Sequence, residues 1–86
     1  MEKEKVCLGS IKSFLKEEYY INKKNEFVQR ILYKLERDNS NLKMAYYYKG
    51  IARGVETAII NMNMALNEDL DNLVQLAFKE AQSEFE

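Results

Sequence analysis

The sequence contains no histidine, no proline and no tryptophan, and it has one cysteine and three glycines among 86 residues. Without histidine the chain lacks the most common general base, proton shuttle and metal ligand of proteins. The single cysteine, Cys7, can neither close an internal disulfide nor complete a structural zinc site. The scarcity of helix-breaking residues favours long helices over a turn-rich β fold. We therefore expect an all-α, non-catalytic protein that holds no metal and no cofactor.

Long apolar runs are also missing. The longest stretch without a charged residue, 57–67, is too short to span a bilayer. The first five residues alternate in charge and lack the apolar run of a signal peptide. Glu68, Asp69 and Asp71 form an acid cluster, but the glycine and the final glutamate of a calcium loop do not follow. We expect a cytoplasmic protein in which these acids lie in the first turn of a helix, where the helix dipole favours them.

The composition that remains, 47% apolar and 31% charged residues, is typical of a globular protein. We expect one helical domain, 1–86, with a core so small that pairing with another copy or a partner would add stability. The charges are unevenly distributed along the chain: residues 1–53 carry a net charge of +5 and residues 54–86 a net charge of −6, which sum to −1. Either the two halves pack against each other with complementary fields, or one end presents a charged patch to a partner.

Apolar residues recur at helical spacing in four segments, at about 8–21, 25–38, 41–66 and 68–84. These segments predict a small antiparallel bundle of three to four helices, which dimerisation could complete. The first apolar stripe comprises Leu8, Ile11, Phe14, Leu15 and Tyr19, and the second comprises Phe27, Val28, Ile31, Leu32 and Leu35. Projected at about 100° per residue, the two stripes point to nearly opposite sides of one continuous helix.

Two arrangements would satisfy these opposed stripes. The first is a break at residues 22–25, where asparagine can end one helix and cap the next. The alternative is one long helix with two buried faces, which would require an intertwined dimer. We predict the break. Residues 38–41 form the clearest loop of the chain, because short polar side chains compete there for the backbone.

Small residues at four-residue spacing, Gly50, Gly54 and Ala58, lie within the third predicted helix. A glycine in the middle of a helix costs about 1 kcal/mol relative to alanine, so two of them require a packing reason. Either another helix of the bundle crosses closely here, or the helix offers a second face to a partner or a second copy. The second reading predicts a partner-binding surface of Tyr46, Gly50, Arg53, Gly54, Thr57, Ile60 and Met64.

Basic residues share one face of the second predicted helix. With a neighbouring tyrosine they form the set Lys23, Arg30, Tyr33, Lys34 and Arg37. Such a face can contact phosphates, and the loop at 38–41 would permit a helix-turn-helix arrangement. The pI of about 5.6 argues against nucleic acid, however. A solvated face, or ion pairs with acids of the fourth helix, is the simpler explanation.

These features together predict a protein–protein interaction module that modulates or inhibits a larger intracellular protein. The abundance of lysine, asparagine, isoleucine and tyrosine fits AT-rich codons, and a phage-encoded inhibitor of a host or defence factor is one form of this hypothesis. Two alternatives stay open. The chain could be a small DNA-binding regulator that uses the basic face, or a homo-oligomeric structural protein.

Overall fold

In the computed structural model the described residues form three helices, α1 (Glu2–Glu36), α2 (Asn39–Asn61) and α3 (Asn67–Ser83). The structure describes the backbone of residues 2–62 and 67–86, and the side chains of residues 11–62 and 69–86. These residues contain no strand, so the predicted all-α class is confirmed for them. None of the helices in this part of the chain is both long and apolar enough to cross a membrane.

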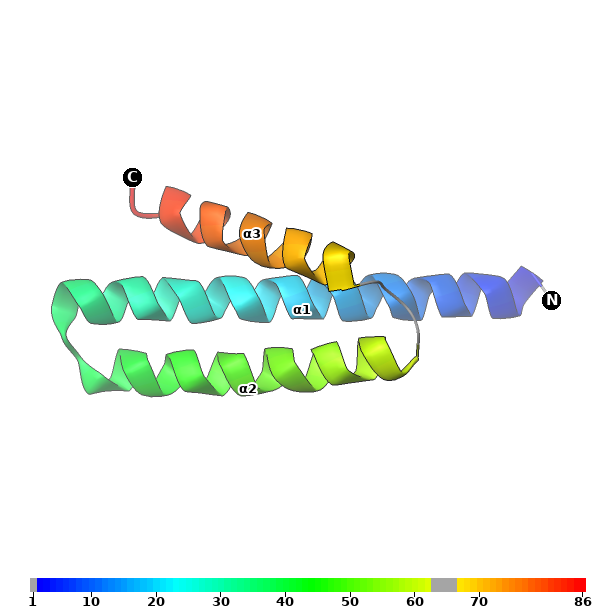
Figure 1. Ribbon diagram of the computed structural model, residues 1–86, viewed down its shortest axis with the longest axis horizontal. Coiled ribbons are helices and arrows are strands. Elements are labelled where there is room, and N and C mark those ends of the chain that lie inside the picture. Colours follow the sequence, from blue (N-terminus) through cyan, green and yellow to red (C-terminus); the bar gives the residue numbers. More distant parts are fainter. Residues whose placement is uncertain (1, 63–66) are drawn as a thin grey trace.

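Helix α1 is the central element of the bundle (Figure 1). At a rise of about 1.5 Å per residue its 35 residues account for the longest dimension of the molecule, 52 Å. Helix α2 returns antiparallel along α1, and α3 then runs in the direction of α1 and diverges from it toward the C-terminus (Figure 1). Most contacts between helices are made by α1 with its two neighbours.

The predicted break at residues 22–25 is wrong, because α1 continues through it. No glycine or proline occurs between Ser10 and Lys49 to interrupt the helix. The Asn22 amide donates a hydrogen bond to the carbonyl oxygen of Glu18 at 2.8 Å, one turn back, and so supports the helix it was expected to end. The first two predicted segments are therefore one helix, and the described residues form three helices, the lower number of the predicted three to four.

The core lies where α1 meets both neighbours. Its buried apolar members are Tyr19, Ala52, Ile59 and Leu70, against which Leu15, Val55, Leu73 and Val74 pack. All of them except Leu70, Leu73 and Val74 come from α1 and α2. Burial of their side chains supplies the main favourable term in folding. The second predicted stripe of α1, in contrast, remains outside this core, and its member Leu35 is exposed.

The turn between α1 and α2 is shorter than the predicted loop at 38–41, since α2 already begins at Asn39. Arg37 adopts a left-handed conformation with φ of 58°, and its amide donates to the carbonyl of Tyr33 at 2.8 Å, which ends α1. The Asp38 carboxylate then caps α2 by accepting hydrogen bonds from the amide and the hydroxyl of Ser40 at 2.9 and 2.8 Å. These bonds lower the pKa of Asp38 below its usual range.

Helix α2 ends at Asn61, before the predicted end at residue 66. The amide of Met62, which caps this end, donates to the carbonyl of Ala58 at 3.1 Å. The predicted contact residue Met64 lies outside the described residues, as does the side chain of Glu68, which was expected in the first turn of the last helix.

Candidate functional site

A groove of about 650 Å³ lies along the C-terminal part of α1, beside the start of α2 and Phe78 of α3. All three helices contribute to its walls. The lining residues are Phe27, Arg30, Ile31, Tyr33 and Lys34 of α1, Arg37 just after α1, Leu42 of α2 and Phe78 of α3. We call this feature the basic groove. Three of its lining residues are cations and none is an acid. It therefore combines apolar walls with a positive rim.

Two rings join α1 to α3 in the apolar part of the groove. The rings of Phe27 and Phe78 meet edge to face, with centroids 5.2 Å apart and planes at 84°. This geometry is favourable for aromatic pairs because the positive edge of one ring meets the negative face of the other. Phe78 is nevertheless 46% exposed, so one side of the pair stays open to a ligand.

The cations of the groove are held in place by aromatic rings and by one buried acid. The guanidinium of Arg37 lies 5.8 Å from the ring centroid of Tyr33, and that of Arg30 lies 5.6 Å from the centroid of Tyr46 in α2. Such contacts are attractive and restrict the freedom of the side chain. Charges that are already positioned lose less entropy when they bind an anion.

Glu26 is the buried acid, with only 3% of the residue exposed. Its Oε1 accepts from the Lys23 ammonium at 2.8 Å, and its Oε2 accepts from Nε of Arg30 at 2.9 Å. Because both carboxylate oxygens are engaged, the acid is paired as a buried charge must be. Glu26 thus holds the side chains of Lys23 and Arg30 in position, although it does not itself line the groove.

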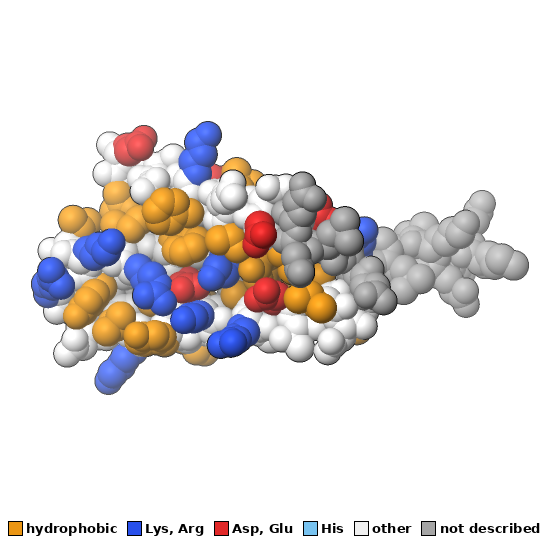
Figure 2. Space-filling view, in the orientation of Figure 1, with side chains coloured by type: hydrophobic (Ala, Val, Ile, Leu, Met, Phe, Trp, Pro, Cys, Tyr) orange, Lys and Arg blue, Asp and Glu red, His pale blue; other side chains and the backbone are white. Residues whose placement is uncertain are grey.

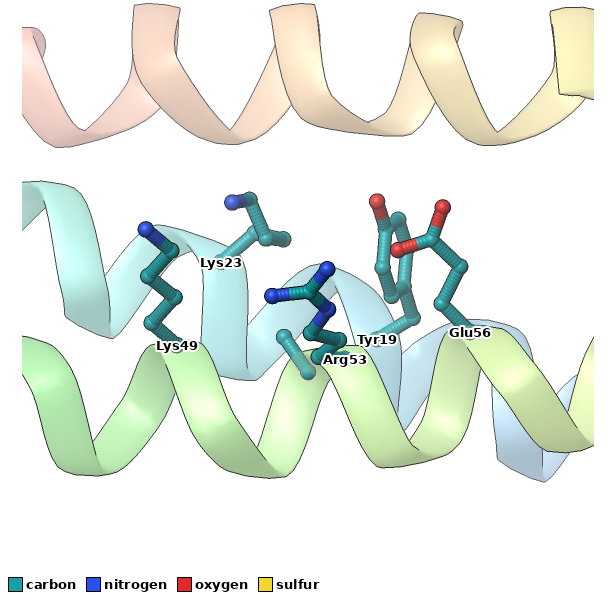
Figure 3. A pocket seen from close by; sticks show the side chains of 6 residues that line it. Tyr19, Lys23, Lys49, Arg53 and Glu56 are labelled. Carbon is teal, nitrogen blue, oxygen red and sulfur yellow. The ribbon is translucent and has the colours of Figure 1, made fainter.

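A second, smaller hollow of about 330 Å³ lies between α1 and α2. Figure 3 shows Tyr19 and Lys23 reaching into it from α1, and Lys49, Arg53 and Glu56 from α2, with the cations gathered on one side and Glu56 beside Tyr19 on the other. Lys23 connects the two hollows, because its ammonium also lies 5.1 Å from the ring centroid of Phe27. The two hollows are parts of one basic face.

The same face is visible in the space-filling view. In Figure 2, lysine and arginine side chains gather on the left half of the visible face with hydrophobic side chains between them, and a few acidic side chains lie among them, near the middle and at the upper left edge. Across the helices, Lys24 pairs with Glu84 of the C-terminal segment at 2.9 Å, and the Tyr20 hydroxyl donates to Glu80. These two contacts connect the basic half of the sequence to its acidic half, as one reading of the divided charge predicts.

Burial raises the pKa of the Tyr19 hydroxyl from its usual 10.0 to about 12, and the nearby carboxylates of Glu56, Asp71 and Glu26 add to the rise. The folded state therefore holds this proton more tightly than the unfolded state. The resulting stabilisation is fully present below pH 10 and is lost as the pH rises through about 12.

We expect Tyr19→Phe to flatten the fall in stability between about pH 10 and 12, because phenylalanine has no proton to lose. Urea unfolding at a series of alkaline pH values measures this fall. Tyr47→Phe serves as the control, since Tyr47 is exposed and should leave the pH profile unchanged. Equal pH profiles for wild type and Tyr19→Phe would contradict the assignment.

The predicted basic residues lie close together in the structure. Arg30, Tyr33, Lys34 and Arg37 line the groove, and Lys23 lines the adjoining hollow. The described members of the predicted partner-binding surface, Tyr46, Gly50, Arg53, Gly54, Thr57 and Ile60, are all exposed on α2. Two of them join the basic face: Tyr46 through Arg30, and Arg53 through the smaller hollow. The two predicted surfaces are therefore neighbours.

The close helix crossing considered for the glycines does not occur within the described residues. No heavy atom outside the local helix lies within 4 Å of a Cβ placed on Gly50 or Gly54. Among the described residues, the glycines therefore face open space and have no packing partner.

Sequence reasoning missed several residues of the site. Phe27 was assigned only to the second apolar stripe, and Phe78, Leu42, Lys49 and the buried Glu26 were not singled out. The spacing of Glu26, three residues after Lys23 and four before Arg30, is a signal of ion pairing along a helix that could have revealed it.

Within the described residues, no group of three or more histidine, cysteine, aspartate or glutamate side chains could hold a metal ion. Comparison of the chain with protein-family models, curated proteins and solved structures finds no match in any of the three. Function is therefore inferred from the basic face itself.

Proposed function

We propose that this chain is a non-catalytic binding module that receives an acidic amphipathic helix of a larger protein in the basic groove and thereby modulates or inhibits that protein. One observation carries the proposal: the groove sets Arg30, Lys34 and Arg37 around apolar walls, with no acid among the residues that line it. An amphipathic helix presents apolar anchors with charges beside them, and grooves of this composition accept it.

The dimensions agree with such an occupant. A volume of about 650 Å³ suits several side chains of a ligand helix, with the helix itself lying along the opening. The Phe27–Phe78 pair and Leu42 would receive apolar side chains, which is the role of the buried centre of an interface. The rim cations would select acids and speed association by steering.

The exposed face of α2 extends this contact surface in the proposal. Tyr46 and Arg53 adjoin the basic face, and Ile60 continues the exposed surface toward the other end of α2. Tyrosine and arginine are residue types that dominate binding energy at interfaces. A phage-encoded inhibitor of a host or defence factor remains one form of the proposal, and the lack of histidine supports a role without catalysis.

Nucleic acid is the competing ligand, because cations and aromatic rings lie together in the groove. The apolar walls of the groove favour the helix, because Ile31 and Leu42 offer nothing to a phosphate but can receive the apolar side chains of an amphipathic helix. The net charge of −1 opposes long-range attraction of a polyanion, and a long nucleic acid carries more negative charge than one acidic helix.

A titration followed by fluorescence anisotropy tests the proposal. The probes are a labelled 20-residue peptide with leucines at helical spacing and glutamates between them, and a labelled 20-nucleotide DNA strand. We expect the peptide to bind more tightly, and the double variant Lys34→Glu/Arg37→Glu to weaken its binding at least about 10-fold, or about 1.4 kcal/mol. Lys12→Glu/Lys43→Glu makes the same change of charge at exposed positions that do not line the groove, and should retain affinity.

Two outcomes would overturn the proposal. If both double variants weakened the peptide equally, the effect would be one of net charge and not of the groove. If the DNA strand bound at moderate salt while the peptide did not, the module would be a nucleic-acid binder instead.

A further inference from the structure

The smaller hollow between α1 and α2 holds positive charge that the basic groove does not use. The residues that line it are Tyr19, Lys23, Lys49, Ala52, Arg53 and Glu56. Three of these side chains are cations and one is an acid, so the lining carries a net charge of +2. In Figure 3 the three cationic groups lie on one side of the hollow, and the Glu56 carboxylate lies on the other, beside Tyr19. One side of the hollow is therefore lined by cations alone.

The hollow is partly shielded from water. Tyr19 and Ala52 are buried, and the side chain of Lys23 is only 18% exposed. Low-dielectric walls of this kind strengthen the attraction between the cations and an anion and raise the local concentration of anions. A volume of about 330 Å³ falls at the lower end of the range of small-molecule sites, about 300–1,000 Å³. The hollow therefore suits a small ligand with negative charge.

The two cations that α2 contributes are not compensated within the described part of the chain. Neither Lys49 nor Arg53 forms an ion pair with another described side chain. They lie four residues apart on one face of the helix, where like charges repel each other. Across the hollow, Lys23 is held in position by the Glu26 carboxylate and the Phe27 ring. An anion between the three cations would relieve this repulsion and would meet one cation that is already ordered.

We propose that the smaller hollow binds a phosphoryl group in its doubly charged form, carried either by free phosphate or by a phosphorylated side chain. A phosphorylated side chain carries a charge of about −1.5 to −2 at pH 7 and three strong acceptor oxygens. The charge matches the net charge of +2 of the lining, and the oxygens match three cationic donors. The planar guanidinium of Arg53 can donate to two oxygens at once, and each lysine supplies a compact charge.

A carboxylate or a phosphodiester matches the hollow less well. A carboxylate has one charge and two oxygens, and each phosphate of a nucleic acid is a diester with one charge. Either group would leave about half of the net positive charge uncompensated. The site does not depend on the proposed function, because no residue that lines the hollow also lines the basic groove. Loss of phosphate binding and loss of peptide binding are therefore separate results.

Amide NMR spectra of the full chain test the inference, with sodium phosphate replacing sodium chloride at constant ionic strength. We expect saturable shifts around the hollow with a Kd of about 1 mM. Lys49→Gln/Arg53→Gln should weaken binding at least about 10-fold, because it removes two of the three cations. Lys12→Gln/Lys43→Gln removes the same charge at exposed positions outside the hollow and should keep the wild-type affinity. Dimethyl phosphate, a diester with one charge, should bind at least about 10-fold more weakly than phosphate.

A short phosphoserine peptide distinguishes the two sources of the phosphoryl group. If it displaces phosphate at a lower concentration than phosphate itself requires, the ligand is a phosphorylated side chain; if it does not, the ligand is free phosphate. Either result supports the site. Shifts that do not saturate or that spread over the whole molecule would overturn it, and so would equal losses in the two double variants or equal affinities for phosphate and dimethyl phosphate. The same spectra show whether each variant is folded.

Discussion

Replacing Ile59 by alanine should lower the free energy of unfolding by about 2–5 kcal/mol, a large share of the stability of a chain this small. Ile59 is fully buried and belongs to the cluster in which α1, α2 and α3 meet. Removing three of its carbons deletes apolar contacts and leaves a cavity that its neighbours fill only in part. The core around it is small, so few other contacts can compensate.

The neighbouring Ile60 provides a matched control, because it lies in the same helix but is 42% exposed. Ile60→Ala should change stability by less than about 0.5 kcal/mol. Both substitutions change helix propensity in the same way, so the difference between them measures burial. Urea unfolding at one fixed protein concentration gives both values. Similar losses for the two variants would mean that the helix is rotated relative to its partners.

Periodicity alone predicted much of the fold. The third and fourth predicted segments, 41–66 and 68–84, contain apolar residues at helical spacing that are buried, namely Ala52, Ile59, Leu70, Ala77 and Ala81. The pattern succeeds there because α2 and α3 each bury one face, and a single face is what a helical stripe reports.

The same reasoning failed in α1 because this helix has neighbours on two sides and an apolar stripe on a third. Polar residues were taken to mark a helix break at 22–25, yet Asn22 and Glu26 are buried in the continuous helix and hydrogen-bonded. A one-dimensional pattern cannot show that a buried acid has found two cations at helical spacing. It also cannot show that Phe78 is 46% exposed while its ring meets that of Phe27.

The candidate site was predictable in its charges but not in its shape. The sequence placed Arg30, Lys34 and Arg37 on one face through their spacing, and these residues do line the groove. Its apolar walls depend on the angle at which α3 leaves α1, which brings Phe78 onto Phe27 across fifty residues of sequence. That angle follows from packing between helices, and no local pattern encodes it.

Glu26 contributes both to the stability of the bundle and to the positions of the cations on the basic face. A substitution at this residue therefore tests both roles. Its carboxylate pairs with Lys23, three residues earlier and within the predicted helix break, and with Arg30, four residues later. Lys23 and Arg30 are only partly exposed, and each depends on this carboxylate for a charge-assisted hydrogen bond. Without the carboxylate, both cations would lose their ion pair while remaining partly buried.

We expect Glu26→Gln to lower the free energy of unfolding by about 2–3 kcal/mol, since removing one member of a buried charge pair leaves the other uncompensated. The partial exposure of the two cations keeps the loss below that of a fully buried pair. Glu36→Gln, at an exposed acid of the same helix, should cost less than about 0.5 kcal/mol. In a double-mutant cycle with Arg30→Gln, the loss from Glu26→Gln should shrink, because part of it is the cost of stranding Arg30. Additive losses would show that Glu26 acts alone and does not position the cations of the groove.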